Sequence, residues 1–396
     1  MIAKTPSAAQ PPLTEQMEDM LSQLEVILAN PVVEEAWYKA IEHVQPTVDE
    51  LGPEQPNPWV GQHPSYLVEY YRGWFTFLAE PHGGLGKIVP FTYFYLNNPY
   101  AFYFLNELES QSGGATEPSK EIFNWSVEFI KVRGQFMDSP ESTLYIQEWL
   151  DYLGDKQKDF IVPPGGYQSF NSFFTRALNY AENPRPITAP DDPSILTASA
   201  DSEINFIQSD LTLETQIPVK SRQINVRDLL NNSQYAERFV GGTAMSCVLM
   251  PNNYHRYHAP ATGQIVESME VPGIYNGIMD GEHWFNQGNI GESTTDFSIF
   301  EDFHRSYFII QTENHGCVAM VPVGLNTISA MFASVVNNQS TLVPPGSPPV
   351  PVQKGDELGH FAYGGSLNIL MFEPGVLGNI NVLMGQRLGE MGTPSS

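Results

Sequence analysis

The sequence predicts an α+β fold, in which a helical N-terminal domain (1–160) precedes a mostly antiparallel β domain (161–396). Two observations lead to this prediction. Apolar residues recur at helical spacing in the first part of the chain, whereas short β-rich runs separated by proline and glycine occupy the second part. A chain of 396 residues with 41% hydrophobic residues is long enough to fill two substantial cores.

The helical domain is predicted from one apolar stripe and two later amphipathic segments. Beyond a proline- and alanine-rich start (1–13), four apolar residues recur at spacings that place them on one helical face. Two further helices are expected at 121–133 and 143–153. The aromatic segment 91–105 is expected to be core rather than a cofactor site. The residues of the stripe are Met17, Leu21, Leu24 and Leu28.

The β domain is expected to begin near the proline- and glycine-rich segment 162–166. Beyond it, six short runs of strand-forming residues are bounded by turn residues, which is typical of antiparallel strands. The segment 345–351 is expected to be an exposed loop. The six predicted strands are 245–250, 264–271, 307–311, 317–323, 327–336 and 367–372.

The charge balance restricts the partners that the protein can attract. Lys and Arg number 19 against 45 Asp and Glu, which gives a formal net charge of −26. A negative field of this size repels nucleic-acid phosphates and anionic lipid surfaces. We therefore expect no nucleic-acid partner, and a cationic or zwitterionic small molecule is the favoured substrate class.

Cysteine usage and the N-terminus indicate the compartment. The two cysteines, Cys247 and Cys317, have no paired spacing, so we expect buried thiols in a reducing environment and neither a disulfide nor a metal site. The N-terminus lacks a signal-peptide pattern, and no apolar run reaches the ~20 residues of a membrane helix. These features predict a cytoplasmic protein without an integral membrane segment, and leave a peripheral membrane contact open.

The tetrapeptide Tyr-Gly-Gly-Ser at 363–366 is the strongest candidate for chemistry. Gly-Gly-Ser alone is a common turn. Here it follows the turn-and-strand segment 352–361 and interrupts the apolar run that continues at 367–372. The segment Tyr-His-Arg-Tyr-His-Ala-Pro at 254–260 adds two histidines three residues apart. Together these features predict a serine that reacts with its own backbone.

The residue types suit self-cleavage between Gly365 and Ser366. Gly365 has no Cβ, so its carbonyl can be approached closely. The Ser366 hydroxyl can attack that carbonyl and convert the peptide bond into an ester. Elimination of the ester then gives dehydroalanine, and hydrolysis gives a pyruvoyl group. Serine needs a base for this attack, and a histidine held by a carboxylate is the usual arrangement.

Four segments, in order along the chain, identify a known family. The second half of the chain resembles the phosphatidylserine decarboxylase family of pyruvoyl enzymes over roughly 165–375, and the β domain is then a pyruvoyl-dependent decarboxylase domain. The segments are Phe-Asn-Ser-Phe-Phe-Thr-Arg at 170–176 with Arg-Pro-Ile at 185–187, the Asp-bearing segment 195–204, the two-histidine segment 254–265, and the cleavage lead-in 354–366.

The resemblance implies roles for specific residues. Ser366 would be the nucleophile and the precursor of the pyruvoyl cofactor, and Gly365 would donate the attacked carbonyl. His258 would be the base that activates Ser366. Asp201 would orient His258 and stabilise its cationic form. The chain would then be a zymogen whose two cleavage fragments, residues 1–365 and 366–396, stay associated.

Further residues are expected near the substrate. His255 is expected to hold the amine or carboxylate or to guide proton return, and Tyr257 and Tyr275 are candidate substrate-binding residues. For Arg176 and Arg256, structural ion pairs are the favoured interpretation, and carboxylate recognition by Arg256 is the alternative.

The chain departs from the usual family pattern at three places. The cleavage site reads Gly-Gly-Ser-Leu instead of Leu-Gly-Ser-Thr, and Ser199 and Ser202 replace a proline and a glycine beside Asp201. These features resemble a soluble branch that includes the fungal tryptophan decarboxylases of the psilocybin type. That branch also has a helical N-terminal extension and an aromatic residue between the two histidines.

The resemblance implies decarboxylation through a Schiff base between the pyruvoyl carbonyl and the amine of the substrate. The first hypothesis for the substrate is a free L-amino acid, aromatic and with tryptophan foremost. The alternative is phosphatidylserine, which would give phosphatidylethanolamine. A third hypothesis, a binding protein that does not process itself, would require replacement of Ser366, His258 or Asp201, and all three are present.

Overall fold

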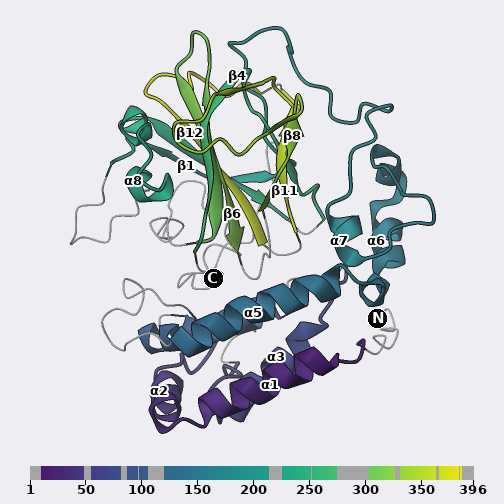
Figure 1. Cartoon of the computed structure of the whole chain (residues 1–396), viewed down its shortest axis with the longest axis vertical. Coiled ribbons are helices and arrows are strands. Elements are labelled where there is room, and N and C mark those ends of the chain that lie inside the picture. The colour runs from purple at the N-terminus through teal and green to yellow at the C-terminus, as the bar shows by residue number, and fades with distance from the viewer. Residues whose placement is uncertain are drawn as a thin grey trace.

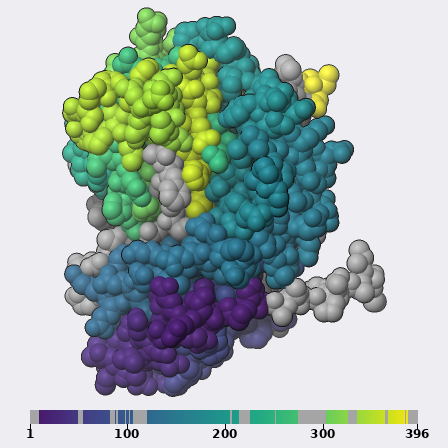
Figure 2. Space-filling view, turned by 45° about the vertical axis from the view of Figure 1, so that its right-hand side comes forward, coloured from purple at the N-terminus to yellow at the C-terminus, as the bar shows by residue number. Residues whose placement is uncertain are grey.

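The computed structural model has the expected α+β class, with helices in the N-terminal half and a mostly antiparallel sheet in the C-terminal half (Figure 1). Figure 2 shows the helical region, purple to blue, packed directly against the β region, green to yellow. The structure describes residues 10–48, 55–81, 87–96, 98–105, 120–213, 225–250, 252–273, 303–325, 331–362, 365–382 and 384–385.

The N-terminal helices begin at residues that satisfy free backbone N–H groups. The Thr14 side chain accepts a hydrogen bond from the Met17 amide at the start of α1 (Glu15–Leu28), and the Asn30 side chain caps α2 (Pro31–Glu42). All four residues of the predicted stripe are buried on α1. The other elements of this region are α3 (Ser65–Phe75), α4 (Ile88–Tyr95), η2 (Pro99–Phe104), α5 (Lys120–Met137), η3 (Pro140–Thr143), α6 (Ile146–Leu153) and η4 (Gly154–Asp159).

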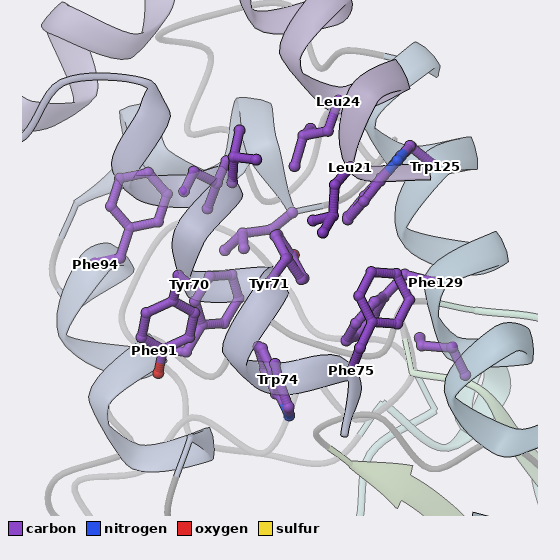
Figure 3. Packing of buried hydrophobic residues seen from close by; sticks show 14 of the residues in the cluster. Leu21, Leu24, Tyr70, Tyr71, Trp74, Phe75, Phe91, Phe94, Trp125 and Phe129 are labelled. Carbon is purple, nitrogen blue, oxygen red and sulfur yellow. The ribbon is translucent and has the colours of Figure 1, made fainter. Parts of the chain in front are cut away.

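Aromatic side chains fill the core of the helical region (Figure 3). Tyr71 on α3 packs edge-on against Trp125 and Phe129 of α5, with ring centroids 4.7 Å apart in both pairs. Phe91 and Phe94 of α4 are also buried here, which confirms that the segment 91–105 contributes core. The predicted helices at 121–133 and 143–153 correspond to α5 and to η3 with α6.

The β region is built on a seven-stranded antiparallel sheet of order β1-β2-β12-β6-β5-β4-β10. Five predicted strands are confirmed as β2, β4, β5, β6 and β12. The sixth, 327–336, is divided into β7 and β8, and 326–330 lies outside the described residues. The strands are β1 (Glu203–Ser209), β2 (Thr243–Leu249), β4 (Gly263–Val271), β5 (Arg305–Gln311), β6 (Cys317–Leu325), β10 (Val350–Val352) and β12 (Gly365–Phe372).

The two faces of this sheet are covered by different elements. On one face, a three-stranded sheet of order β3-β11-β7 shares a buried cluster with the large sheet. On the other face, α8 and η5 pack over a second cluster. The remaining elements are α7 (Phe170–Phe174), α8 (Val226–Leu229), η5 (Ala236–Phe239), β3 (Arg256–His258), β7 (Met331–Ala333), β8 (Val335–Val336), β9 (Gln339–Ser340) and β11 (Glu357–Phe361).

The helical and β regions meet through α5 and α7. Phe123 of α5 packs against the cluster beneath α8, while Phe170, Phe173 and Phe174 of α7 belong to the core of the helical region. The domain boundary at residue 160 remains a prediction.

Cys247 and Cys317 are both buried and free, as expected. Within the described ranges, no helix combines the length and apolar character needed to cross a bilayer.

Candidate active site

The expected cleavage site lies at the start of an interior strand. Gly365 and Ser366 are the first residues of β12. Ser366 pairs with Leu249 of β2 on one side and with Gly324 of β6 on the other. Its residue exposure is 1%, so the hydroxyl is shielded from bulk water.

His255 is the histidine that contacts this serine. Its Nδ1 lies 3.1 Å from the Ser366 Oγ, and its Nε2 lies 3.1 Å from the carbonyl oxygen of Met250. A carbonyl oxygen only accepts hydrogen bonds, so the proton of the neutral ring belongs on Nε2. The Nδ1 lone pair then faces the serine hydroxyl, which is the arrangement that a general base requires.

Phe174 fixes the plane of the His255 ring. The two rings stack with centroids 3.7 Å apart and an interplanar angle of 21°. Phe174 is the last residue of α7, which begins with a reciprocal capping box between Ser169 and Ser172. The segment 170–176 therefore supplies the surface on which the histidine rests.

Two arginines link the segment that carries Phe174 to the segment that carries His255. Arg176 follows α7 and donates to the carbonyls of Asn252 and Asn253, at 3.0 and 2.9 Å. Arg256 follows His255 and donates to the Thr175 carbonyl at 2.9 and 2.7 Å. We call these four hydrogen bonds the arginine clamp.

The ion-pair expectation for the arginines is confirmed for one of them. Arg256 forms a salt bridge of 2.7 Å with Glu357 of β11, in addition to its part in the clamp. Arg176 instead binds backbone carbonyls and lies over the rings of Phe160 and Phe173. A buried guanidinium with these neighbours has a structural role.

His258 does not occupy the position expected for the base of Ser366. Its Nδ1 donates to the Gly355 carbonyl at 2.7 Å, and its Nε2 accepts from the Tyr254 hydroxyl at 3.0 Å. The two histidines are three residues apart, so an extended chain directs them to different sides, and His255 is the one directed at Ser366. Burial lowers the pKa of His258, and the charges of Glu357 and Asp201 oppose this shift.

Asp201 differs from its expected pairing with His258. Both of its carboxylate oxygens accept from Arg185, with distances of 2.9, 3.2 and 2.7 Å. The planar guanidinium fork of arginine matches a carboxylate, which explains this preference. Arg185 also pairs with Asp159 at 3.2 Å. The sequence contained Arg185 within the matching segment 185–187 but gave no role for it.

The predictions for the two tyrosines expected near the substrate, Tyr257 and Tyr275, are treated separately by the structure: it describes the first and not the second. Tyr257 is fully buried among apolar side chains, next to Phe308 and Phe361, and its hydroxyl has no hydrogen-bond partner among the described residues. This position brings it into the core rather than against Ser366. Tyr275 lies outside the described residues.

A cavity of about 350 Å³ lies where the helical and β regions meet. Tyr254, the partner of His258, forms part of its wall together with Asp201 and Arg185. Tyr152 and Phe160 contribute the helical side. This cavity could not be predicted from the sequence, because its walls come from segments that are distant along the chain.

A shielded serine, a preceding glycine and a histidine whose Nδ1 lone pair faces the serine together form the arrangement that self-cleavage at this serine would require. These residues fit a pyruvoyl precursor, because Ser366 Oγ has a base at 3.1 Å and the residue before it is Gly365. A family model described as phosphatidylserine decarboxylase matches residues 170–390. The chain therefore belongs to the phosphatidylserine decarboxylase family.

Individual relatives agree with the family assignment. The phosphatidylserine decarboxylase proenzyme of Clostridium novyi (strain NT) is 29% identical over 245 residues, which are 62% of this chain and 74% of that protein. Proenzyme 3 of Schizosaccharomyces pombe is 31% identical over 244 residues, 62% of this chain and 23% of that protein. Proenzyme 2 of Oryza sativa subsp. japonica is 30% identical over 243 residues, 61% of this chain and 35% of that protein.

Membership defines the reaction class. The protein is a pyruvoyl-dependent decarboxylase, a lyase, whose pyruvoyl group is derived from a serine of its own chain. This confirms the enzyme class and the cofactor that the resemblance implied. The chain spans about a quarter to a third of the two eukaryotic relatives, and 74% of the bacterial one.

Proposed function

We propose that the chain cuts itself between Gly365 and Ser366, and that the mature enzyme decarboxylates a free L-amino acid, aromatic and with tryptophan foremost. The observation that carries the self-cleavage is the 3.1 Å contact between His255 Nδ1 and Ser366 Oγ. The proposed substrate rests on the net charge and on the likeness to the soluble branch.

His255 acts as the base in the first step. Its Nδ1 takes the hydroxyl proton of Ser366 as Oγ bonds to the Gly365 carbonyl carbon. The Gly365–Ser366 C–N bond then breaks, the nitrogen takes up a proton, and an ester links the two residues. Removal of the Ser366 α-proton breaks the Cβ–O bond, which releases the Gly365 carboxylate and leaves dehydroalanine. Tautomerisation and hydrolysis release ammonia and leave the pyruvoyl group.

Tyr254 and His258 form a second acid–base pair, to which we assign proton transfer during turnover. The pair is hydrogen bonded at 3.0 Å, and Tyr254 lines the cavity between the two regions. Asp201 acts here through its charge, which favours the protonated form of His258, and through its fixed position on Arg185. The pyruvoyl group itself supplies an electron sink for the loss of carbon dioxide from an amine-bearing acid.

The fragment that begins at residue 366 stays bound after cleavage. Strand β12 forms antiparallel ladders with β2 and β6 on its two sides, over Ser366 to Phe372 in both cases. Its apolar side chains are buried in clusters on both faces of the sheet. Backbone pairing on both edges and burial on both faces together retain the fragment without a covalent link.

The net charge of −26 supports a zwitterionic small substrate over a lipid in an anionic membrane, because the protein is repelled from such a surface. The alternative is phosphatidylserine, with phosphatidylethanolamine as the product. The names of the relatives favour this alternative. Both substrates present the same group, an α-amino acid carboxylate, to the active site.

Mass spectrometry of the purified protein tests the self-cleavage, and it should find a fragment with a pyruvoyl group at position 366. An intact, serine-containing chain would contradict the proposal. Incubation with a panel of L-amino acids and with phosphatidylserine vesicles tests the substrate. We expect carbon dioxide and the amine from an aromatic amino acid, and phosphatidylethanolamine as the only amine product would establish the alternative.

A further inference from the structure

Asn368 has an unusual environment for a polar residue. Its exposure is 0%, and neither the nitrogen nor the oxygen of its side-chain amide has a hydrogen-bond partner among the described residues. On the neighbouring strands it lies opposite Cys247 and Pro322, whose side chains offer an amide little or nothing to bind. A buried amide without partners destabilises the folded state, so its presence in the centre of a sheet needs an explanation.

The position of Asn368 suggests the explanation. Side chains alternate along β12, and Leu367, Ile369 and Met371 belong to the cluster beneath α8. Leu370 and Phe372 belong to the opposite cluster. Ser366 and Asn368 therefore share the second face.

On a strand, residues two apart are separated by about 7 Å, so a small molecule held at residue 366 reaches the side chain of residue 368. Asn368 is thus the next side chain along the strand on the face of the reactive serine.

We infer that Asn368 binds the amino-acid end of the substrate after β12 has been cut, an inference that rests on the proposed self-cleavage. Its Nδ2 donates to the substrate carboxylate, and its Oδ1 accepts from the amine. In the uncut chain both atoms are sealed, as Ser366 is. Cleavage frees the end at Gly365, and this opens the face that Ser366 and Asn368 share.

The amide is suited to a zwitterion. One donor and one acceptor side by side match an α-amino acid carboxylate without adding a net charge to the site. Free amino acids and the serine headgroup of a phospholipid share this group. Asn368 therefore recognises the reacting end of the substrate, and other side chains recognise the rest of it.

The test is Asn368→Leu, which removes the amide and keeps a similar shape. In a Ser366→Ala background, where the chain stays uncut, we expect Asn368→Leu to raise the thermal midpoint by about 2 °C or more, because an unpaired buried amide has been lost. We expect kcat/KM to fall by about tenfold or more, because the hydrogen bonds to the substrate are lost. Self-cleavage should be unchanged. Rates are measured with L-tryptophan and with phosphatidylserine vesicles, which separates the two sources of the amino-acid group.

Ser246→Ala is the matched control. Ser246 lies on β2 at 1% exposure, and its hydroxyl also has no partner among the described residues. It pairs with Ile369, so it lies on the other face of the sheet. This variant should also be at least as stable as wild type, with unchanged kcat/KM.

Three outcomes would overturn the inference. An Asn368→Leu enzyme with kcat/KM within twofold of wild type for both substrates would show that the amide does not bind substrate. A lowered thermal midpoint in both Asn368→Leu and Asn368→Ala would show that the amide has a structural partner. An uncut Asn368→Leu chain would assign the residue to self-cleavage. A wild-type chain that stays uncut would instead contradict the proposed function itself.

Discussion

A single backbone carbonyl determines which nitrogen of His255 can act as a base. The Met250 carbonyl accepts from Nε2, and the lone pair of Nδ1 is thereby directed at Ser366. The ring needs no change of tautomer before it takes the serine proton. A neutral His258 is likewise fixed, because the Gly355 carbonyl accepts from its Nδ1. The two histidines thus present opposite nitrogens to their partners.

Replacing each histidine should separate the two stages of the enzyme. In His255→Gln we expect self-cleavage to slow by about 100-fold or more, because the base at Ser366 is lost. In His258→Gln we expect self-cleavage near the wild-type rate but little decarboxylation. Conversion of the precursor on denaturing gels and release of carbon dioxide measure the two stages. Prompt cleavage of His255→Gln together with an uncut His258→Gln would reverse the assignment.

The stability of the uncut chain should fall in mild acid. Burial and the nearby Arg256 lower the pKa of His360 to about 4, from its ordinary value of 6.5. Between these values the unfolded chain binds a proton that the folded chain does not. Stability contributed by neutral His360 is therefore present above pH 6.5 and is lost on acidification towards pH 4, by about 1.4 kcal/mol per pH unit.

Thermal midpoints of Ser366→Ala protein between pH 7.5 and 5 measure this effect without interference from cleavage. A second variant, Ser366→Ala with His360→Gln, should lose less stability over the same interval. Equal losses in the two proteins would show that His360 does not titrate as described.

The reacting bond could be located from the sequence, but the contacts of the histidines could not. Gly365 and Ser366 stood out because the serine follows two glycines and leads into an apolar strand. The position of His255 depends on Phe174, which comes from a segment about 80 residues earlier. Asp201 was recognised from its segment, while its partner Arg185 required the fold to bring the two together.

At the scale of elements, the five residues of α7 connect the two regions of the protein. The Phe170 amide donates to Ser142 at 2.8 Å, and Asn171 donates to Asp138 at 2.9 Å, which fixes the helix to the end of α5 and to η3. At its other end, Phe174 stacks on His255 and the arginine clamp holds the flanking backbone. The helical region thus contributes to the position of the base.

Phe174→Leu tests this connection. The variant retains an apolar side chain but loses the flat surface on which His255 rests, so we expect self-cleavage to slow by about tenfold. Phe174→Tyr should restore most of the rate. The time course of precursor conversion provides the measurement.

Phe173→Leu is the control for that experiment. Phe173 lies on the same helix, is equally buried, and packs against Trp149 and Tyr167 instead of His255. Both leucine variants should lose roughly 1 to 2 kcal/mol of stability. Only Phe174→Leu should cleave slowly, and equal rates in the two folded variants would argue against a positioning role for Phe174.

Elements with strong local patterns could be predicted, whereas those made by contacts could not. The long interior strands β2, β6 and β12 are rich in apolar residues, and α1 has a regular apolar stripe. Strand β3 has only three residues, and its local sequence has no strand pattern. It is extended because it pairs with β11. The run 327–336 has the sequence pattern of one strand, but its later residues form β8 and pair with β9.

At the scale of the whole molecule, a long segment with little regular structure crosses the outside of the β region between α7 and β1. Lys354 binds it through three backbone carbonyls, those of Ala189, Asp192 and Ile195, at 2.6 to 3.0 Å. Arg185 holds its later part through Asp201. Ionic and carbonyl contacts therefore replace regular secondary structure along this segment, and it connects the helical region to the sheet.

The interior location of β12 also sets the order of folding and cleavage. His255 and the Ser366 hydroxyl come into contact only when the sheet has formed, so folding must precede cleavage. The folding of the uncut precursor involves a single chain and is therefore unimolecular. Once cut, the protein can refold only if two separate chains find each other, with the short one entering the middle of a sheet. We expect refolding of denatured mature enzyme to depend on protein concentration, and that of Ser366→Ala to be independent of it. Before cleavage, the stability of the protein is set by a reversible folding equilibrium. After cleavage, its lifetime is set by the rate at which it unfolds, because unfolding is no longer readily reversed.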